Sequence, residues 1–252
     1  MAKLTRLDCG LLHADLAMFE AGSEGEVTLP VNAWLVQHAR GTVLFDAGLP
    51  ATFVEGSATK DRVLKFMGIT VLEENTVAAQ LSAVSQDPAK VDFVVISHLH
   101  FDHMGGLSLI PNATLVIQRK EWEAGMAVSQ ETKTLHERSD FDLGHKLKLI
   151  DGEHDFFGDG TVVCLPTPGH TVGHQSLRIT LASGHKVLLA ADCCYFARTV
   201  DSQVLPTFGH DLEEQRKTLQ RVRKLRDEGA IVIPGHDIGF VNNMPKILGI
   251  DN

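Results

Sequence analysis

The sequence is poor in aromatic hydroxyls and thiols, and it contains no long apolar run. Its 252 residues include one tyrosine, two tryptophans and four cysteines. No stretch of about eighteen apolar residues occurs, so no segment is expected to span a bilayer. The opening segment MAKLTR also lacks the apolar stretch of a secretory signal. A cytoplasmic location is therefore expected.

The four cysteines show no disulfide framework. They are Cys9, Cys164, Cys193 and Cys194, and the last two are adjacent. Adjacent cysteines seldom bond to each other, so free thiols in a reducing compartment are the expected state.

An excess of positive charge is also missing. The chain has 23 basic and 32 acidic residues, which gives a net charge of −9. Such a field repels phosphates, so neither nucleic acid nor an anionic membrane is an expected partner. Hydrophobic residues make up 44% and charged residues 22%, a globular mixture. Without a visible repeat or linker, residues 1–252 are expected to form a single domain.

The apolar patterns predict strands interleaved with helices, which is typical of the α/β or layered α+β class. The clearest helix is 211–228, where Asp211 can cap the start and Gly229 can end it. A second helix is expected at 75–86. Strands are expected at 31–38, 42–45, 91–97, 114–118, 161–165, 175–181, 186–190 and 230–234.

Histidine is abundant, with thirteen copies, and its placement is informative. His98, His100, Asp102 and His103 directly follow the expected strand 91–97. Four potential ligands within six residues cannot all face one way on a regular strand or helix. A tight loop is expected to direct them at two neighbouring points, with Gly105 and the glycine after it allowing the turn.

Three further potential ligands also follow apolar strands. His170 comes after 161–165, Asp192 after 186–190 and His236 after 230–234. Ligands in sheet proteins commonly lie at the carboxyl ends of strands. Seven such donors are enough for two metal ions. Imidazole and carboxylate without thiolate suit zinc, and iron, manganese or cobalt are also compatible.

These motifs resemble those of the metallo-β-lactamase superfamily. His98-Leu99-His100-Phe101-Asp102-His103 matches its HxHxDH motif, and His170, Asp192 and His236 stand in the order of its remaining ligands. The segment 43–48 resembles its early strand and turn, where Asp46 has a supporting role. The resemblance covers roughly residues 30–237. It implies a four-layered αβ/βα sandwich with the metals at one edge.

The resemblance also implies a ligand set and a reaction. His98, His100 and His170 would bind the first metal ion, Asp102, His103 and His236 the second, and Asp192 both. A hydroxide between the two ions would attack an ester, thioester, lactone, amide or phosphoester.

Within the superfamily, the sequence is most similar to the N-acyl homoserine lactonases, which act in quorum quenching. Common zinc β-lactamases lack a bridging carboxylate such as Asp192. Glyoxalase II enzymes carry a C-terminal helical region, whereas this chain ends sixteen residues after His236. The lactonases have a tyrosine three residues after the bridging aspartate, as Tyr195 is here.

The resulting hypothesis is ring opening of a lactone. Tyr195 would donate a hydrogen bond to the carbonyl or its oxyanion, and Asp102 would pass a proton to the leaving alkoxide. The alternative is a related hydrolase of another small ester, thioester or phosphoester. A redox-active relative is a third, more distant option, and a homodimer is a family-based expectation. Candidates for an acyl-chain pocket are Met18, Phe19, Phe66, Met67 and Phe208, and the other eight histidines have no ligand-like context.

Overall fold

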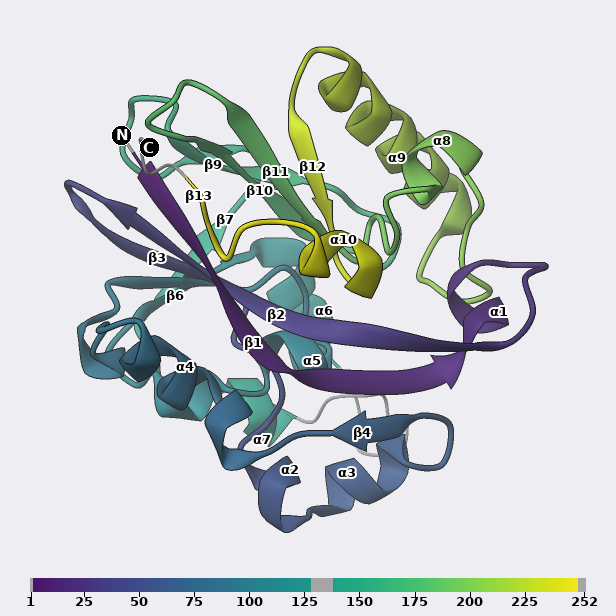
Figure 1. Cartoon of the computed structure of the whole chain (residues 1–252). Helices are drawn as coiled ribbons and strands as arrows, with labels where there is room; N and C mark the ends of the chain where they lie inside the picture. Colours follow the sequence, from purple (N-terminus) through teal and green to yellow (C-terminus); the bar gives the residue numbers. More distant parts are fainter. Residues whose placement is uncertain (1, 128–137, 249–252) are drawn as a thin grey trace.

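The computed structural model describes residues 2–127 and 138–248, and they form four layers. Two β-sheets stack face to face, and helices cover the outer face of each sheet (Figure 1). Three apolar cores lie between successive layers. The expected αβ/βα sandwich is confirmed.

Within the described residues, the first sheet contains eight strands in the order β13-β1-β2-β3-β5-β6-β7, with β4 paired to β1. Strands β3, β5, β6 and β7 run parallel, so their carboxyl ends meet at one edge. The bounds are β1 Ala2–Asp15, β2 Glu26–His38, β3 Gly41–Phe45, β4 Gly68–Thr70, β5 Phe93–Val95, β6 Thr114–Gln118, β7 Leu147–Ile150 and β13 Ile247–Leu248.

The second sheet contains five strands in the order β12-β11-β10-β9-β8. Residues along β11 alternate between two cores: Val187 and Leu189 face the first sheet, whereas Leu188 and Ala190 face the covering helix. The bounds are β8 His154–Asp155, β9 Val162–Pro166, β10 Gln175–Thr180, β11 Lys186–Ala191 and β12 Ile231–Pro234.

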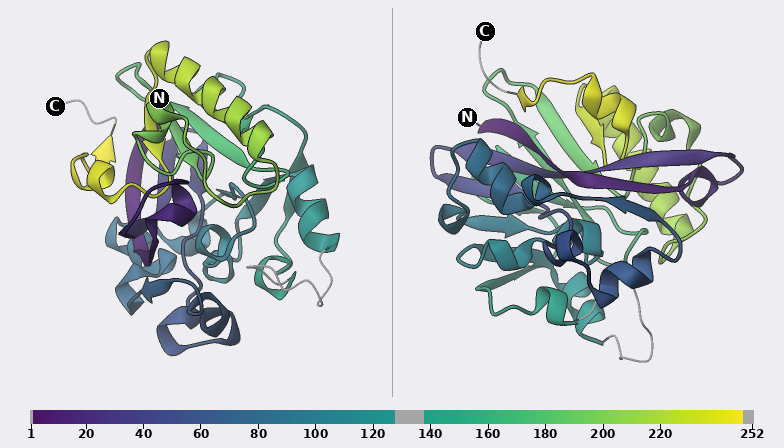
Figure 2. Two further views of the ribbon diagram at one scale, coloured as in Figure 1. Left: turned by 90° about the vertical axis from the view of Figure 1, so that its right-hand side faces the viewer. Right: turned by 60° about the horizontal axis from the view of Figure 1, so that its bottom comes forward.

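The outer layers are helical. Helices α8 and α9 cover the second sheet, and helices α2 to α7 lie on the first-sheet side (Figure 2). The bounds are α1 Leu16–Phe19, α2 Thr52–Glu55, α3 Ala58–Val63, α4 Val77–Ala83, α5 Phe101–Met104, α6 Arg119–Ala127, α7 Arg138–Phe141, α8 Thr199–Ser202, α9 Leu212–Asp227 and α10 Ile238–Asn242. None of the helices in the described residues is long and apolar enough to cross a membrane.

Helix α9 confirms the strongest sequence signal. Asp211 caps it by accepting a hydrogen bond from the Glu214 backbone N–H at 3.0 Å. Helix α4 is shorter than the expected 75–86, because residues 73–75 form a separate 3₁₀ turn and Thr76 caps the helix. The expected strand 91–97 is likewise reduced to Phe93–Val95.

The sequence pattern missed β1, which is the longest strand. Its pairing with β2 shifts register between Asp8 and Leu11, and this bulge breaks the two-residue alternation by which a strand is recognised. Gly10 in the bulge has φ +111°, and a Cβ atom there would lie 2.9 Å from the Thr70 carbonyl oxygen. Both observations explain the glycine at this position.

Candidate metal centre

The seven predicted ligands converge at one edge of the sandwich. His98 follows β5 of the first sheet, while His170, Asp192 and His236 follow β9, β11 and β12 of the second. The side chains form the same two groups that the resemblance implies: His98, His100, His170 and Asp192; and Asp102, His103 and His236. The described residues contain no other such group of metal-binding side chains.

The segment after β5 is partly helical, whereas the sequence predicted a loop. Asp102 and His103 lie in the short helix α5, whose first turn is closed by hydrogen bonds from His103 and Met104 N–H to the His100 carbonyl. Because of this helical turn, the side chains of Asp102 and His103 point in a different direction from those of the two preceding histidines. This separation divides the motif between the two groups.

The two glycines after α5 also act differently from the prediction. Neither has a positive φ. A Cβ atom at Gly105 would lie 2.3 Å from Pro50 Cδ, and one at Gly106 would lie 2.2 Å from the Ala47 carbonyl oxygen. Glycine is therefore required by the close approach of the 46–50 segment.

In the first group, three imidazole nitrogens form a compact triangle. His98 Nε2 and His100 Nδ1 are 2.9 Å apart, and His170 Nε2 lies 3.1 Å and 3.0 Å from them. Tetrahedral zinc with bonds of about 2.0–2.1 Å places its ligand atoms about 3.3–3.4 Å apart. The triangle is close to that size.

Asp192 lies between the two groups. Its Oδ2 is 3.4 Å from His170 Nε2, whereas its Oδ1 is 3.0 Å from both His103 Nε2 and His236 Nε2. Asp102 Oδ2 completes the second group, at 3.4 Å from His103 Nε2 and 3.6 Å from His236 Nε2. Each oxygen of Asp192 thus faces a different set of nitrogens.

The protonation states in the first group suit a cation. Burial holds the pKa of His98 and of His170 well below the usual imidazole range, so both rings are neutral. Burial opposes ionisation of Asp192, but His103 and His236 outweigh it and hold its pKa well below the usual range. Neutral imidazoles and an ionised carboxylate are the forms that bind metal.

His103 Nε2 gives a direct test of fit. This atom is buried and makes no hydrogen bond of good geometry within the described residues, although Asp192 Oδ1 lies 3.0 Å away. Buried polar atoms are normally satisfied, so an orphan that faces two carboxylates and a second imidazole fits a cation at that point. We conclude that the residues present suit a divalent metal ion.

Hydrogen bonds from outside the two groups orient the ligand rings. His103 Nδ1 lies 2.8 Å from Asp46 Oδ2, which also accepts from the Ser97 hydroxyl at 3.0 Å. His236 Nδ1 donates to the Pro30 carbonyl at 3.0 Å. In both rings Nδ1 is held by a hydrogen bond from outside the centre, and Nε2 faces the other ligands.

Backbone strain occurs at two points in this arrangement. Asp46 has φ +59°, and Ala191, immediately before Asp192, has φ +48°. Non-glycine residues rarely adopt this left-handed region, and they persist in it only where the surrounding structure imposes it. Asp46 carries the carboxylate that contacts His103, and Ala191 directly precedes the carboxylate of Asp192. Both strained positions therefore help to orient a carboxylate at the centre.

Tyr195 reaches the centre from the segment after Asp192. It is buried, and its hydroxyl lies 3.1 Å from His170 Nδ1. Burial and the nearby Asp192 carboxylate raise its pKa well above 10, so the phenol stays protonated. With Nδ1 protonated, His170 donates to the phenol oxygen, and the phenol O–H can itself donate, with the Asp192 carboxylate as one acceptor beside it.

Glu121 is a supporting residue that the sequence did not reveal. From α6 its buried carboxylate accepts from the Leu99 N–H at 3.0 Å and the Gly173 N–H at 2.9 Å. It therefore ties the segment carrying His98 and His100 to the segment carrying His170. No spacing signal marks it, because the three segments are distant in sequence.

The thiols are free, as predicted. All four cysteines are buried, and none of them forms a disulfide. Burial raises the pKa of Cys9 and of Cys193 to about 12, so neither is a thiolate. No cysteine belongs to either ligand group in the part of the chain that the structure describes.

A groove of about 320 Å³ opens beside the first group. His100 and His170 form one end of it, and Leu99, Gly125 and Phe208 contribute apolar surface. Of the proposed acyl-pocket candidates, Phe208 lines this groove. Phe66 and Met67 instead line a different cavity, beside His13.

The remaining two candidates lie near the groove or in the core. Phe19 packs edge-on against Tyr195 and Phe208, with ring centroids 5.1 Å and 5.6 Å apart. Met18 packs against the core between the first sheet and its helices. Neither side chain lines the groove itself.

Comparison with known proteins identifies the family. A model of the metallo-beta-lactamase superfamily matches residues 27–236, which is most of the chain. The chain therefore belongs to the metallo-β-lactamase superfamily. Its motifs, its four layers and its two ligand groups agree with this assignment.

Similar proteins include several N-acyl homoserine lactonases. The chain is 32% identical over 227 residues to N-acyl homoserine lactonase AttM of Azorhizobium caulinodans, covering 86% of this chain and 85% of that protein. It is 31% identical over 220 residues to N-acyl homoserine lactonase AiiA of Bacillus thuringiensis subsp. kurstaki, covering 84% and 83%. Both relatives are named for lactone hydrolysis.

A solved structure gives the same result at the level of fold. The chain superposes on an N-acyl homoserine lactone hydrolase with a TM-score of 0.84 and 27% identity, covering 96% of each chain. That hydrolase was solved with the product N-hexanoyl-L-homoserine at its catalytic metal centre.

Proposed function

We propose that this chain is a two-metal lactonase that opens the ring of N-acyl homoserine lactones. The observation that carries the proposal is the position of Asp192 between two clusters of imidazoles. A carboxylate shared in this way suits two metal ions side by side. The relatives named as lactonases support the choice of substrate.

We propose zinc as the metal, held by the seven residues assigned above. Five imidazoles and two carboxylates, with no thiolate among them, suit zinc, although the same donors accept iron, manganese or cobalt. When bound, the ions lower the pKa of water and polarise the carbonyl of the substrate.

Tyr195 is proposed as the donor to the substrate. Its phenol remains protonated, and His170 engages its oxygen without consuming its hydrogen. That hydrogen can therefore be donated to the lactone carbonyl and to the oxyanion that develops from it. A donor placed in this way stabilises the transition state more than the ground state.

Asp102 is proposed to deliver the proton to the leaving alkoxide. Its Oδ2 belongs to the second group, 3.4 Å from His103 Nε2 and 3.6 Å from His236 Nε2. Asp102 would combine this role with metal binding, and a carboxyl group at the reacting centre is suited to it.

The groove beside His100 and His170 is proposed to hold the acyl chain. Its apolar surface comes from Leu99, Gly125 and Phe208, and its volume is about 320 Å³. Burial of a methylene group on such surface stabilises a complex by about 0.8 kcal/mol. The groove therefore favours a substrate with an apolar arm over a bare lactone.

One assay distinguishes these proposals from the alternative hydrolases. Zinc-loaded protein is tested against N-hexanoyl homoserine lactone, γ-butyrolactone, a glutathione thioester and a phosphodiester. The proposal predicts that the acylated lactone has the highest kcat/KM. Fast thioester turnover with no lactone opening would assign the chain to another branch of the superfamily.

We also propose how the chain is organised into domains and subunits. Residues 1–252 are proposed to form one catalytic domain, because the strands that supply the ligands come from both sheets and share one edge. A homodimer is proposed from the family resemblance alone. Light scattering after gel filtration measures the mass, and a value near 27.5 kDa would contradict the dimer.

A further inference from the structure

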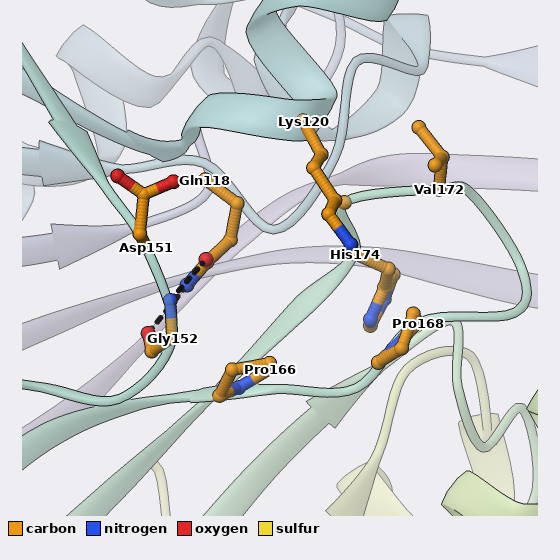
Figure 3. A pocket seen from close by; sticks show the side chains of 9 residues that line it. Gln118, Lys120, Asp151, Gly152, Pro166, Pro168, Val172 and His174 are labelled. Atoms are coloured by element: carbon orange, nitrogen blue, oxygen red, sulfur yellow. Dashed lines mark hydrogen bonds between the residues drawn. The ribbon is translucent and has the colours of Figure 1, made fainter.

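A second cavity, of about 230 Å³, lies beside the segment that carries His170 (Figure 3). None of the seven proposed metal ligands lines it. Pro166, Pro168 and Val172 give it apolar walls, and His174 and Lys120 contribute polar groups. The cavity is large enough for a small organic molecule.

His174 lines this cavity and carries an unsatisfied polar atom. The side chain is fully buried, and its Nε2 has no hydrogen-bond partner within the described residues. Buried polar atoms normally have a partner, because leaving one unpaired is unfavourable. A ligand that pairs with Nε2 would remove that cost.

The hydrogen bonds on the Nδ1 side of the His174 ring determine whether Nε2 is a donor or an acceptor. The Ser176 hydroxyl can donate to the Ala190 carbonyl at 3.0 Å, and in that arrangement the Thr167 hydroxyl donates to Ser176 Oγ at 2.9 Å. Thr167 Oγ1 must then accept from His174 Nδ1–H, also at 2.9 Å. In a neutral imidazole this leaves Nε2 as a bare acceptor, which requires a hydrogen-bond donor.

Lys120 supplies a positive charge at the same cavity. Its exposed side chain extends from the start of α6 toward the cavity (Figure 3). Within the described residues it has no ion-pair partner, whereas Asp151 on the rim is paired with Arg119 Nε at 3.0 Å. The unpaired lysine favours a ligand with a negative charge.

The remaining polar wall is already satisfied. Gln118 donates to the Gly152 carbonyl at 2.9 Å and accepts from the Gly152 N–H at 3.0 Å (Figure 3). These groups shape the cavity without requiring a partner. The polar requirements of a ligand therefore come from His174 and Lys120.

We propose that this cavity is a second ligand site, which binds a small carboxylate that also carries an N–H donor, of the N-acyl amino acid class. The donor pairs with His174 Nε2, the carboxylate with Lys120, and the apolar part contacts Pro166, Pro168 and Val172. Binding is non-covalent and separate from the metal centre.

One consequence rests on the proposed function. Opening an N-acyl homoserine lactone gives a free carboxylate and an amide N–H in one molecule, so the product belongs to the class that this site would bind. His174 also packs near two proposed metal ligands, with ring centroids 5.1 Å from His98 and 5.9 Å from His170. A product molecule in this site would lie close behind the metal centre.

Calorimetric titration of the zinc-loaded protein with three related probes tests the site. N-acetylglycine has both the N–H and the carboxylate, N-acetylsarcosine lacks the N–H, and N-acetylglycinamide lacks the carboxylate. N-acetylglycine is expected to bind at least about tenfold more tightly than either analogue, which corresponds to about 1.4 kcal/mol. Equal affinities for the three probes, or no binding, would overturn the proposal.

Variants and a crystal soak locate the binding. Lys120→Gln is expected to weaken N-acetylglycine binding at least tenfold and to leave lactone turnover unchanged, whereas the surface control Lys224→Gln changes neither. A soaked crystal should show the N–H of N-acetylglycine against His174 Nε2. Binding at the metal ligands alone, or an unaltered affinity in Lys120→Gln, would contradict the second site. Because these readouts measure binding, they fail or succeed independently of lactone hydrolysis.

Discussion

Asp46 lies 2.8 Å from His103 Nδ1, and this contact fixes which nitrogen of His103 faces the metal centre. Nε2 is then directed at Asp192 Oδ1, 3.0 Å away. Asp46 adopts a left-handed backbone conformation, with φ +59°, to reach this position. A residue that binds no metal thus orients one that does.

Asp46→Asn tests this relationship. An amide at position 46 has no negative charge to pair with the proton on Nδ1 of His103. It can also turn its NH₂ group toward the ring. Metal affinity is expected to fall about 10- to 100-fold, as is usual for the loss of such a supporting carboxylate. Competition with a chromophoric chelator measures it. The exposed Asp227→Asn serves as control, and unchanged affinity in Asp46→Asn would contradict the orienting role.

Tyr195→Phe separates donation to the substrate from support of His170. The variant retains the ring but loses the hydroxyl that lies 3.1 Å from His170 Nδ1. We expect kcat for lactone opening to fall about 100-fold, as for loss of one oxyanion donor, with two metal ions still bound. Loss of metal with normal turnover per bound metal would instead make Tyr195 a supporting residue only.

Glu121→Gln should weaken the link between the two ligand-bearing segments. The carboxylate accepts two backbone N–H groups, and an amide can accept only one of them while turning its own donor toward the other. A loss of about 1–3 kcal/mol in unfolding free energy is expected from chemical denaturation. Glu123→Gln, exposed on the same helix, is the matched control. Equal stability of both variants would show that the link is unimportant.

Metal binding should release a proton near neutral pH. Burial lowers the pKa of His103, but Asp192, Asp102 and Asp46 outweigh burial and raise it well above 6.5 in the metal-free protein. The imidazolium must lose its proton before Nε2 can bind metal, so affinity falls as pH drops below this pKa. Calorimetry at pH 7 in buffers of different ionisation enthalpy should detect at least one proton released, because the pKa of His236 is raised as well. Zero release would refute the assignment of His103 as a ligand.

Ala124→Phe should shorten the preferred acyl chain. Ala124 is exposed and lines the groove beside His100 and His170. A phenyl group there removes contact with about two methylene groups, at about 0.8 kcal/mol each, so decanoyl substrate should lose about tenfold in kcat/KM relative to butanoyl. Ala127→Phe, on the same helix but outside the groove lining, is the control. An unchanged substrate ratio in Ala124→Phe would place the acyl chain elsewhere.

The strand ends of the site could be predicted because local sequence encodes them. His98, His170 and His236 each follow a short apolar run, and the convergence of strand ends at one edge brings them together. The helical form of Phe101–Met104 was not predictable, since the close packing of Gly105 and Gly106 against the 46–50 segment appears only in three dimensions.

Other features were missed for related reasons. The bulge in β1 removed the alternation that identifies strands. Glu121 contacts Leu99 and Gly173, and neither separation follows a helical or strand period. The four-layered arrangement came from the family resemblance, because periodicity defines elements but not how sheets stack.

The most direct test measures metal content and ring opening on the same preparations. Wild-type protein and Asp192→Asn are each titrated with zinc, and opening of N-hexanoyl homoserine lactone is followed by proton release. We expect two zinc ions per wild-type chain and activity that rises with the second ion. In Asp192→Asn we expect loss of metal binding as well as activity. Full lactone turnover in a metal-free protein, or in Asp192→Asn, would contradict a two-metal lactonase.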